Sequence, residues 1–357
     1  MPLKQKSKKR ILFLGETYRA DAITWIKGLE QFGDFEVVTW ELKNSSNGIS
    51  RIQRILELIV SFFSIRKIAK KHNPDMIIAE RTTSYGFLAA LSGVKPIAIA
   101  QQGFSDLWPE NSLLYYPKKI VQDYAFKKAT LIHAWGPVMA EHMYKSKVPQ
   151  SKILILPKGI DLSFFAFNNQ KNVEEINAIV TRSLLPEYQH EIILKAFGEL
   201  KRNNIPFNLT IVGDGMLFEE LKLKAKKLNI NDHVNFIGRI QNKELPKLLM
   251  QANIYISMPS TEGVSASLFE AMACGCFPIV SDLPGNKSWI NQHKNGILVP
   301  STDYKKLAQE IEYVKQNQEL QKNVIEFNRR FVEENINYNV NMKKIAETYH
   351  QLINEQL

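Results

Sequence analysis

Cysteine is scarce in this chain of 357 residues, which contains only Cys274 and Cys276, one residue apart. That spacing does not suit an ordinary disulfide, so a secreted disulfide framework is excluded and a reducing compartment is favoured. Long hydrophobic runs are lacking as well. The longest, 55–65, is broken by Glu57 and is well short of the ~20 residues that a bilayer span needs. Only a short apolar stretch, 11–15, follows the basic start, so we expect no secretory signal and a cytoplasmic location.

The composition, 45% hydrophobic and 23% charged, is typical of globular proteins and excludes disordered and fibrous classes. The net charge of +10 is unevenly distributed, since residues 1–165 hold 24 Lys and Arg against 14 Asp and Glu. This asymmetry indicates a polyanionic partner for the first half: nucleic acid, an anionic membrane or a phosphorylated substrate. A lysine-rich, solvated surface would give the same balance.

Apolar strand-like runs alternate with segments of helical period in both halves. The runs are 11–14, 36–40, 75–79, 96–100, 130–134 and 153–156, then 178–181, 208–212, 234–237, 254–257 and 278–281. Short apolar strands between helices indicate parallel sheets covered on both faces. The sequence therefore predicts an α/β fold of two doubly wound, Rossmann-like domains, 1–165 and 166–337, facing a cleft. We expect the C-terminal helix, 338–357, to return to the first domain.

The loop after 254–257 carries residue types suited to a sugar nucleotide. Glu262 and Gly263 precede a helix expected to begin near Val264 or Ser265, and Glu270 is expected about two turns into it. The first-turn N–H groups, including those of Ser265 and Ala266, can bind an anion, and the carboxylates can accept hydrogen bonds from sugar hydroxyls. On spacing alone, the two glutamates are equally well a capping acid and a helix-surface residue.

Several short motifs decide between these interpretations. They are VGDG at 212–215, VNFIG at 234–238, the glutamates 262 and 270, EAMACG at 270–275, PIVSD at 278–282, NGILVP at 295–300, and LPKGID at 156–161 with FF at 164–165. Taken in their order along the chain, these motifs resemble the nucleotide-binding domain of the family-4 glycosyltransferases, a retaining group with the GT-B fold. The first half resembles the family's acceptor domain more loosely.

The resemblance implies a role for each matching residue. Glu270 would hold the ribose hydroxyls, Glu262 would contact the donor sugar, and Arg182 would bind the diphosphate. The full implied nucleotide-sugar site comprises Gly15, Arg182, Tyr188, Gly213, Gly215, Ile237, Arg239, Glu262, Gly263, Val264, Ser265, Ala266 and Glu270. A guanidinium beside the departing diphosphate supplies preorganised electrostatic stabilisation.

Two positions depart from the family pattern. No lysine follows Arg182, where the family usually has a second diphosphate cation; Tyr188 and His190 stand there and supply a neutral hydrogen bond and, in the case of His190, a possible charge. Gln102 stands where the acceptor domain usually has a histidine. Glutamine cannot act as a base, so Asp106 is the nearest titratable substitute. The expected catalytic set is Glu262, Arg182, Gln102 and Asp106.

No Asp-x-Asp pair occurs, and the seven histidines lack metal-ligand spacing, so we expect neither a metal nor a separate cofactor. The segment 49–71 has the pattern of a basic amphipathic helix. It could lie on an anionic bilayer and present a lipid-linked acceptor, or it could simply cover the sheet as a crossover helix.

These features and the resemblance together predict a metal-independent glycosyltransferase at the inner membrane surface, and the resemblance implies that it is a retaining one. It would move a hexose from a nucleotide-diphosphate sugar to a glycan acceptor, expected to be lipid-linked, in cell-surface polysaccharide or lipopolysaccharide synthesis. The main alternative is a nucleotide-sugar-binding protein that has lost turnover, which the missing lysine and histidine suggest. A nucleic-acid partner is disfavoured, because no nucleic-acid-binding motif occurs.

Overall fold

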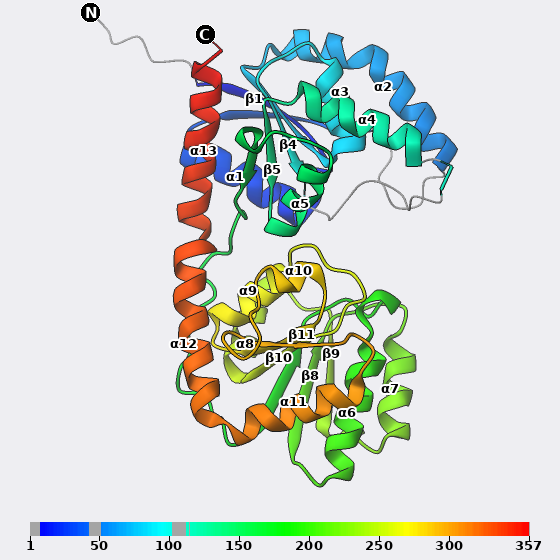
Figure 1. Cartoon of the computed structure of the whole chain (residues 1–357), viewed down its shortest axis with the longest axis vertical. Coiled ribbons are helices and arrows are strands. Elements are labelled where there is room, and N and C mark those ends of the chain that lie inside the picture. Colours follow the sequence, from blue (N-terminus) through cyan, green and yellow to red (C-terminus); the bar gives the residue numbers. More distant parts are fainter. Residues whose placement is uncertain (1–7, 43–50, 102–111, 114, 357) are drawn as a thin grey trace, which may run out of the picture. The chain divides into compact units, whose positions relative to one another are not determined.

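The computed structural model of the protein describes residues 8–42, 51–101, 112–113 and 115–356. The chain divides into two compact units: unit 1 is Met1–Lys158 with Asn339–Leu357, and unit 2 is Gly159–Tyr338. Each unit holds one parallel sheet of six described strands with helices on both faces (Figure 1). The prediction of two doubly wound α/β sheets is confirmed.

The sheet of unit 1 has the strand order β2-β1-β3-β4-β5-β6. Its strands are β1 (Arg10–Leu14), β2 (Glu36–Trp40), β3 (Met76–Glu80), β4 (Ile97–Gln101), β5 (Leu131–Ala134) and β6 (Ile153–Ile155). Its helices are α1 (Ala20–Gly33), α2 (Arg51–His72), α3 (Phe87–Leu91), α4 (Tyr115–Lys128) and α5 (Pro137–Lys145). Because parallel crossovers are right-handed, α1 covers one face and α2, α3 and α4 cover the other. Helix α3 contacts both α2 and α4.

The C-terminal helix α13 (Tyr338–Asn354) belongs largely to unit 1. The Tyr349 hydroxyl lies 3.2 Å from Nδ1 of the buried His133, and the His133 Nε2 lies 2.6 Å from the Leu156 carbonyl. The Asn341 amide donates to the Pro157 carbonyl at 2.9 Å. Helix α13 is therefore tied to the end of the sheet by polar contacts as well as by its apolar face.

The sheet of unit 2 has the order β12-β11-β10-β7-β8-β9. Its strands are β7 (Ile176–Val180), β8 (Phe207–Val212), β9 (Val234–Gly238), β10 (Ile254–Ser257), β11 (Phe277–Ser281) and β12 (Ile297–Val299). Its helices are α6 (His190–Arg202), α7 (Phe218–Lys227), α8 (Leu245–Gln251), α9 (Ala266–Ala273), α10 (Pro284–Lys287), α11 (Tyr304–Gln316) and α12 (Gln318–Asn335).

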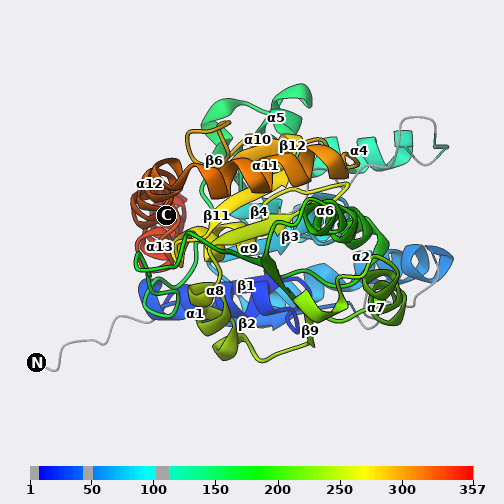
Figure 2. The ribbon, with the colours of Figure 1, turned by 90° about the horizontal axis from the view of Figure 1, so that it is seen from below.

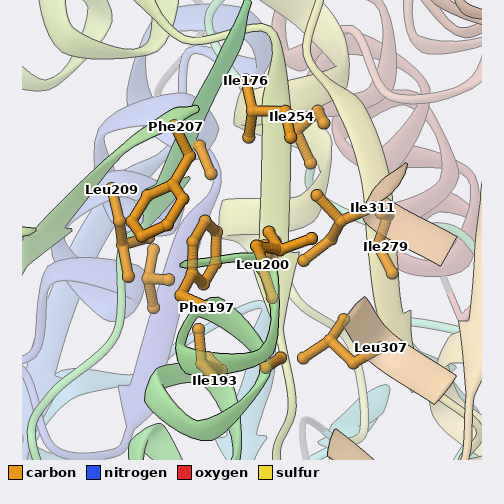
Figure 3. Packing of buried hydrophobic residues seen from close by; sticks show 14 of the residues in the cluster. Ile176, Ile193, Phe197, Leu200, Phe207, Leu209, Ile254, Ile279, Leu307 and Ile311 are labelled. Atoms are coloured by element: carbon orange, nitrogen blue, oxygen red, sulfur yellow. The ribbon is translucent and has the colours of Figure 1, made fainter. Parts of the chain in front are cut away.

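Side chains that alternate along the strands of unit 2 belong to two separate hydrophobic cores, one on each face of the sheet. Ile176 belongs to the core shown in Figure 3, which also contains Phe197 of α6 and Leu307 of α11. Ile179 on the same strand belongs to the other core, with Leu268 of α9. Helices α6 and α11 are in contact and lie side by side (Figure 2). Burial on both faces fixes the strand register, because a shift of one residue would exchange the two cores.

Candidate functional site

Strand order identifies one place on the sheet of unit 2 where a ligand is expected. Strands β7 and β10 are neighbours, and the chain proceeds away from them in opposite directions, through β8 and β9 on one side and β11 and β12 on the other. Open α/β sheets bind ligands beyond the carboxyl ends of the strands at such a switch point. Arg182 follows β7 and Glu262 follows β10, so both residues lie at this point.

The Arg182 side chain is held by several groups at once. Its guanidinium forms an ion pair with the Glu262 carboxylate and donates to the hydroxyls of Ser265, at 2.6 Å, and Ser257, at 3.3 Å. The Tyr188 ring centroid lies 5.2 Å from the guanidinium carbon. The Arg182 and Glu262 side chains are only 14% and 13% exposed, so solvent screens their interaction weakly. The guanidinium is thus fixed in place at the rim of the sheet.

Close backbone contacts bring the loop after β8 against the loop after β7. Gly213 has φ 151°, and a Cβ at this position would collide with the Arg182 carbonyl. A Cβ at Gly215 would lie 2.9 Å from the Leu184 nitrogen. These contacts give both glycines a structural reason besides the expected approach of a nucleotide. Two further residues of the implied nucleotide-sugar site lie near the end of β9: Ile237 is half-buried within the strand, and Arg239 is exposed just after it.

Ser265 connects the ion pair to the start of α9. It is the N-cap of this helix, and its hydroxyl accepts a hydrogen bond from the Leu268 N–H at 3.3 Å. The helix proper begins at Ala266, after the position that the sequence predicts. Glu270 is therefore the fifth helical residue, just beyond one turn, and the expectation of two turns is wrong. Gly263 and Val264 form the loop before the cap.

His190 does not supply a second positive charge beside Arg182. It is the first residue of α6, it is 1% exposed, and its Nε2 lies 2.9 Å from the Ser183 carbonyl. Burial, together with the neighbouring Arg182 charge, lowers the pKa of His190 below its usual 6.5, so the ring is neutral at pH 7. The suggestion that His190 contributes charge to the diphosphate site is wrong. Residues 183–189 contain no cation either.

Unit 1 has a similar ion pair at its own switch point. Strands β1 and β3 are neighbours there, and Glu16 follows β1 while Arg81 follows β3. The Arg81 guanidinium donates to the buried Glu16 carboxylate at 2.7 Å, and Arg19 reaches the same carboxylate at 3.3 Å. The Glu80 carboxylate accepts from the Glu16 N–H at 3.1 Å. We call Glu16, Arg19, Glu80 and Arg81 the unit 1 polar cluster.

The unit 1 polar cluster also accounts for Gly15. A Cβ on this glycine would lie 2.6 Å from a Glu80 carboxylate oxygen. Arg81 adopts the left-handed conformation, with φ 61°, at the start of the π-helical turn η1 (Arg81–Gly86). Sequence reasoning selected Gly15 but missed Glu80 and Arg81. The available signal was a pair of charged residues directly after a continuous apolar strand.

Two expected catalytic residues, Gln102 and Asp106, lie outside the described residues. Their neighbour Gln101 ends β4, is buried, and accepts a hydrogen bond from the Thr82 hydroxyl at 2.6 Å. Within the described part of the chain, no three His, Cys, Asp or Glu side chains gather as a metal-binding group. None of the described helices combines the length and the apolar character needed to cross a membrane.

Each of the two units matches a known protein family. The profile described as "Glycosyl transferases group 1" matches residues 163–331, within unit 2, and the profile described as "Glycosyl transferase 4-like" matches residues 10–134, within unit 1. Among solved structures, the Anabaena protein HepE in complex with UDP superposes with a TM-score of 0.77 at 15% identity, over 97% of this chain and 100% of that one. The fold is that of the GT-B glycosyltransferases.

Curated relatives agree with this class. An uncharacterized glycosyltransferase of Methanocaldococcus jannaschii is 25% identical over 69% of this chain, a match that spans 64% of the relative. A Campylobacter jejuni alpha-1,4-N-acetyl-D-galactosaminyltransferase, whose name specifies an undecaprenol-diphosphate-linked acceptor, is 25% identical over 76% of this chain and 74% of the relative. The chain belongs to the group 1, family-4-like glycosyltransferases.

Proposed function

We propose that this protein is a retaining, metal-independent glycosyltransferase that moves a hexose from a nucleotide-diphosphate sugar to a lipid-linked glycan on the cytoplasmic side of a membrane. The product would enter cell-surface polysaccharide or lipopolysaccharide synthesis. The proposal depends above all on the Arg182–Glu262 ion pair at the switch point of unit 2. The UDP complex of HepE and the lipid-linked acceptor of the Campylobacter relative support the donor and acceptor classes.

On the donor side, Arg182 would bind the diphosphate and neutralise the charge that develops on it as the sugar leaves. Glu262 would accept hydrogen bonds from the sugar hydroxyls, and Glu270 from the ribose hydroxyls. The start of α9 would add its positive helix dipole, which favours a phosphate there. In retaining transfer of this kind a leaving phosphate oxygen takes the acceptor's proton, so the absence of a histidine at Gln102 does not prevent the reaction.

On the acceptor side, the unit 1 polar cluster would orient the incoming hydroxyl-rich glycan. Arg19 and Arg81 carry donors at the carboxyl edge of the sheet, and their side chains are 44% and 34% exposed. Glu16 holds both guanidinium groups by charge-assisted hydrogen bonds, which fixes their direction. Gln102 and Asp106, which follow β4 in the sequence, are also proposed to act on the acceptor.

A thermal-shift panel followed by a transfer assay tests the proposal. UDP, GDP, ADP and CMP are added to purified protein with their sugar conjugates, and the one that binds raises the melting temperature according to RT ln(1 + [L]/Kd). The selected donor is then tested with a water-soluble glycan. Stabilisation with sugar transfer supports the enzyme, whereas stabilisation with no transfer to any acceptor favours a binding protein without turnover. The absence of a lysine after Arg182 motivates this alternative.

A further inference from the structure

Helix α2 exposes five large apolar side chains to solvent. Leu56, Ile59, Val60, Phe62 and Phe63 are 56%, 52%, 68%, 43% and 76% exposed, and we call them the α2 apolar surface. Large apolar residues of a crossover helix normally face the sheet. Five of them exposed within eight residues form a contiguous patch, and patches of this kind mark surfaces that bind a partner or a membrane.

The opposite side of α2 already provides its contact with the rest of unit 1. Ser61, Ile65 and Ala69 are buried, at spacings of four residues that form one helical face. Packing against unit 1 therefore does not account for the α2 apolar surface. The buried face fits the interpretation of this segment as a crossover helix, whereas the membrane interpretation stays a prediction, which the exposed apolar face motivates.

Basic residues continue the same exposed stripe toward the end of the helix. At 3.6 residues per turn, Leu56, Ile59, Val60 and Phe63 align with Lys67 and Lys70. Lys67, Lys70 and Lys71 are all exposed. The whole of α2 contains six Lys and Arg residues and a single acid, Glu57.

This combination of side chains discriminates between possible partners. Two copies of the chain that paired along this stripe would bring two positively charged helices together, and the repulsion between them is unfavourable. A bilayer rich in anionic lipid complements both features, because apolar side chains enter the boundary between headgroups and acyl chains while lysines contact the headgroups.

The topology places the apolar part of the stripe toward the same edge of the sheet as the unit 1 polar cluster. Helix α2 leads from the carboxyl end of β2 to the amino end of β3, so it runs antiparallel to the strands and its first half lies toward their carboxyl edge. The unit 1 polar cluster follows β1 and β3 at that same edge. On the same face of the sheet, the first half of α4 adds Tyr116 and Ile120, each 70% exposed.

We propose that the α2 apolar surface, with Lys67, Lys70 and Lys71, inserts into the interface of an anionic lipid bilayer. The attachment deepens the proposed function, because it would deliver a lipid-linked acceptor to the carboxyl edge of unit 1. The binding itself does not depend on transfer, so the two proposals fail in different experiments.

The first test is flotation of the purified protein with vesicles. We expect binding to phosphatidylglycerol-rich vesicles and little binding to pure phosphatidylcholine. Raising the ionic strength from about 0.1 M to about 1 M shortens the Debye length from about 10 Å to about 3 Å and should release most of the protein. Equal binding to neutral vesicles, or binding that salt does not weaken, would overturn the electrostatic part of the proposal.

Paired variants with matched controls locate the surface. Lys67→Gln, Lys70→Gln and Lys71→Gln together should lower the partition coefficient about 100-fold, since each basic residue at an anionic surface contributes about fivefold. Lys226→Gln, Lys227→Gln and Lys247→Gln remove the same charge from exposed positions of unit 2 and should leave binding nearly unchanged. Arg66 is left in place because its side chain donates to the Leu91 carbonyl at 3.0 Å.

The apolar contribution is tested separately with Val60→Gln and Phe63→Gln, which should reduce vesicle binding at least tenfold, about 1.4 kcal/mol. The control pair is Met216→Gln and Leu223→Gln, which alters two exposed apolar residues of unit 2, 79% and 60% exposed. All four variants should melt close to the wild-type temperature, which shows that they fold, and their transfer to a water-soluble acceptor should be normal. Sedimentation without lipid provides the final check: a dimer of the wild type that the Val60 and Phe63 changes dissociate would overturn the proposal in favour of self-association.

Discussion

Arg182 and Glu262 form an ion pair across the switch point of unit 2, from the ends of the neighbouring strands β7 and β10. Glu16 and Arg81 form the corresponding pair across the switch point of unit 1, from the ends of β1 and β3. In both units the position where an open α/β sheet receives ligands is thus occupied by a fixed guanidinium and a carboxylate. A diphosphate that binds Arg182 must compete with Glu262 or displace it.

Glu262→Gln should separate donor binding from turnover. The substitution keeps the size of the side chain but removes the charge that competes with the diphosphate for Arg182. A charge-assisted hydrogen bond contributes about 1.5–3 kcal/mol, so we expect nucleoside diphosphate to bind at least about tenfold more tightly. Turnover should fall, because the sugar loses its carboxylate. Calorimetry with the diphosphate measures the first effect, and weaker binding in this variant would contradict the competition.

Arg182→Lys should not be conservative. Lysine keeps the charge but loses the planar group that reaches Glu262, Ser257 and Ser265 together. No other cation lies between Arg182 and the neutral His190 in the sequence, so no charge in this segment can take over the contacts of the lost guanidinium. We expect kcat to fall at least about 100-fold, roughly the effect of removing one preorganised donor. Single-turnover kinetics with saturating donor would measure it; near-normal turnover would show that another cation stabilises the diphosphate.

Glu270→Ala should weaken the binding of the nucleotide by about 1–3 kcal/mol, because a ribose hydroxyl pair would lose its acceptor. Unlike Glu262→Gln, this change should weaken the binding of the nucleoside and of the nucleoside diphosphate equally, since the proposed contact of Glu270 is with the ribose and not with the diphosphate. Comparing the two ligands by thermal shift distinguishes the roles. A loss confined to the diphosphate would contradict the assignment of Glu270 to the ribose.

Arg81→Gln should act on the acceptor and leave the donor unaffected. It removes one of the two guanidinium groups on Glu16 while Arg19 remains. We expect KM for a soluble acceptor to rise about tenfold, with the nucleotide-induced stabilisation of unit 2 unchanged. A matched change, Arg239→Gln at an exposed position of the implied nucleotide-sugar site, should produce the opposite pattern. An unaltered acceptor KM in Arg81→Gln would remove the unit 1 polar cluster from the acceptor site.

The alternation of apolar strands and amphipathic helices was enough to predict both sheets. Strand β10 is found at the predicted residues. Strand β7 begins two residues before the predicted start and ends one residue before the predicted end, because Ile176 also pairs, with Phe207 of β8. Strand β12 was seen only as part of a motif, since three residues are too few to show a period. The motifs also selected Arg182 and Glu262, which the structure brings together.

Long-range burial and pairing could not be read from the sequence. His190 looked available beside Arg182, but the packing of α6 buries it and lowers its pKa. The Glu16–Arg81 pair joins residues far apart in the chain, and only the strand order makes them neighbours. The pattern of α2 likewise gave an apolar and basic helix without showing which apolar residues remain exposed. Each of these features depends on tertiary contacts and not on local spacing.

The stability of unit 1 should depend on pH through His133. Burial lowers the pKa of His133 to about 4, from 6.5 in the unfolded chain. Below pH 6.5 the unfolded state therefore takes up a proton that the folded state does not. The stabilisation is complete above about pH 6.5 and is lost as the pH falls toward 4, by about 3 kcal/mol in all.

His133→Gln should remove this contribution, because glutamine does not titrate but can donate to the Leu156 carbonyl and accept from the Tyr349 hydroxyl. Between pH 6.5 and 4 the free energy of unfolding of the variant should fall less steeply than that of the wild type, by up to about 1.4 kcal/mol per pH unit. Denaturant titrations across this range measure the difference between the slopes. Tyr349→Phe is the matched control: it should lower stability at every pH but keep the wild-type slope, because burial and not the hydroxyl sets the pKa of His133. If the unfolding free energies of the wild type and His133→Gln fall with equal slopes between pH 6.5 and 4, His133 takes up its proton in the folded protein as well, and the prediction is wrong.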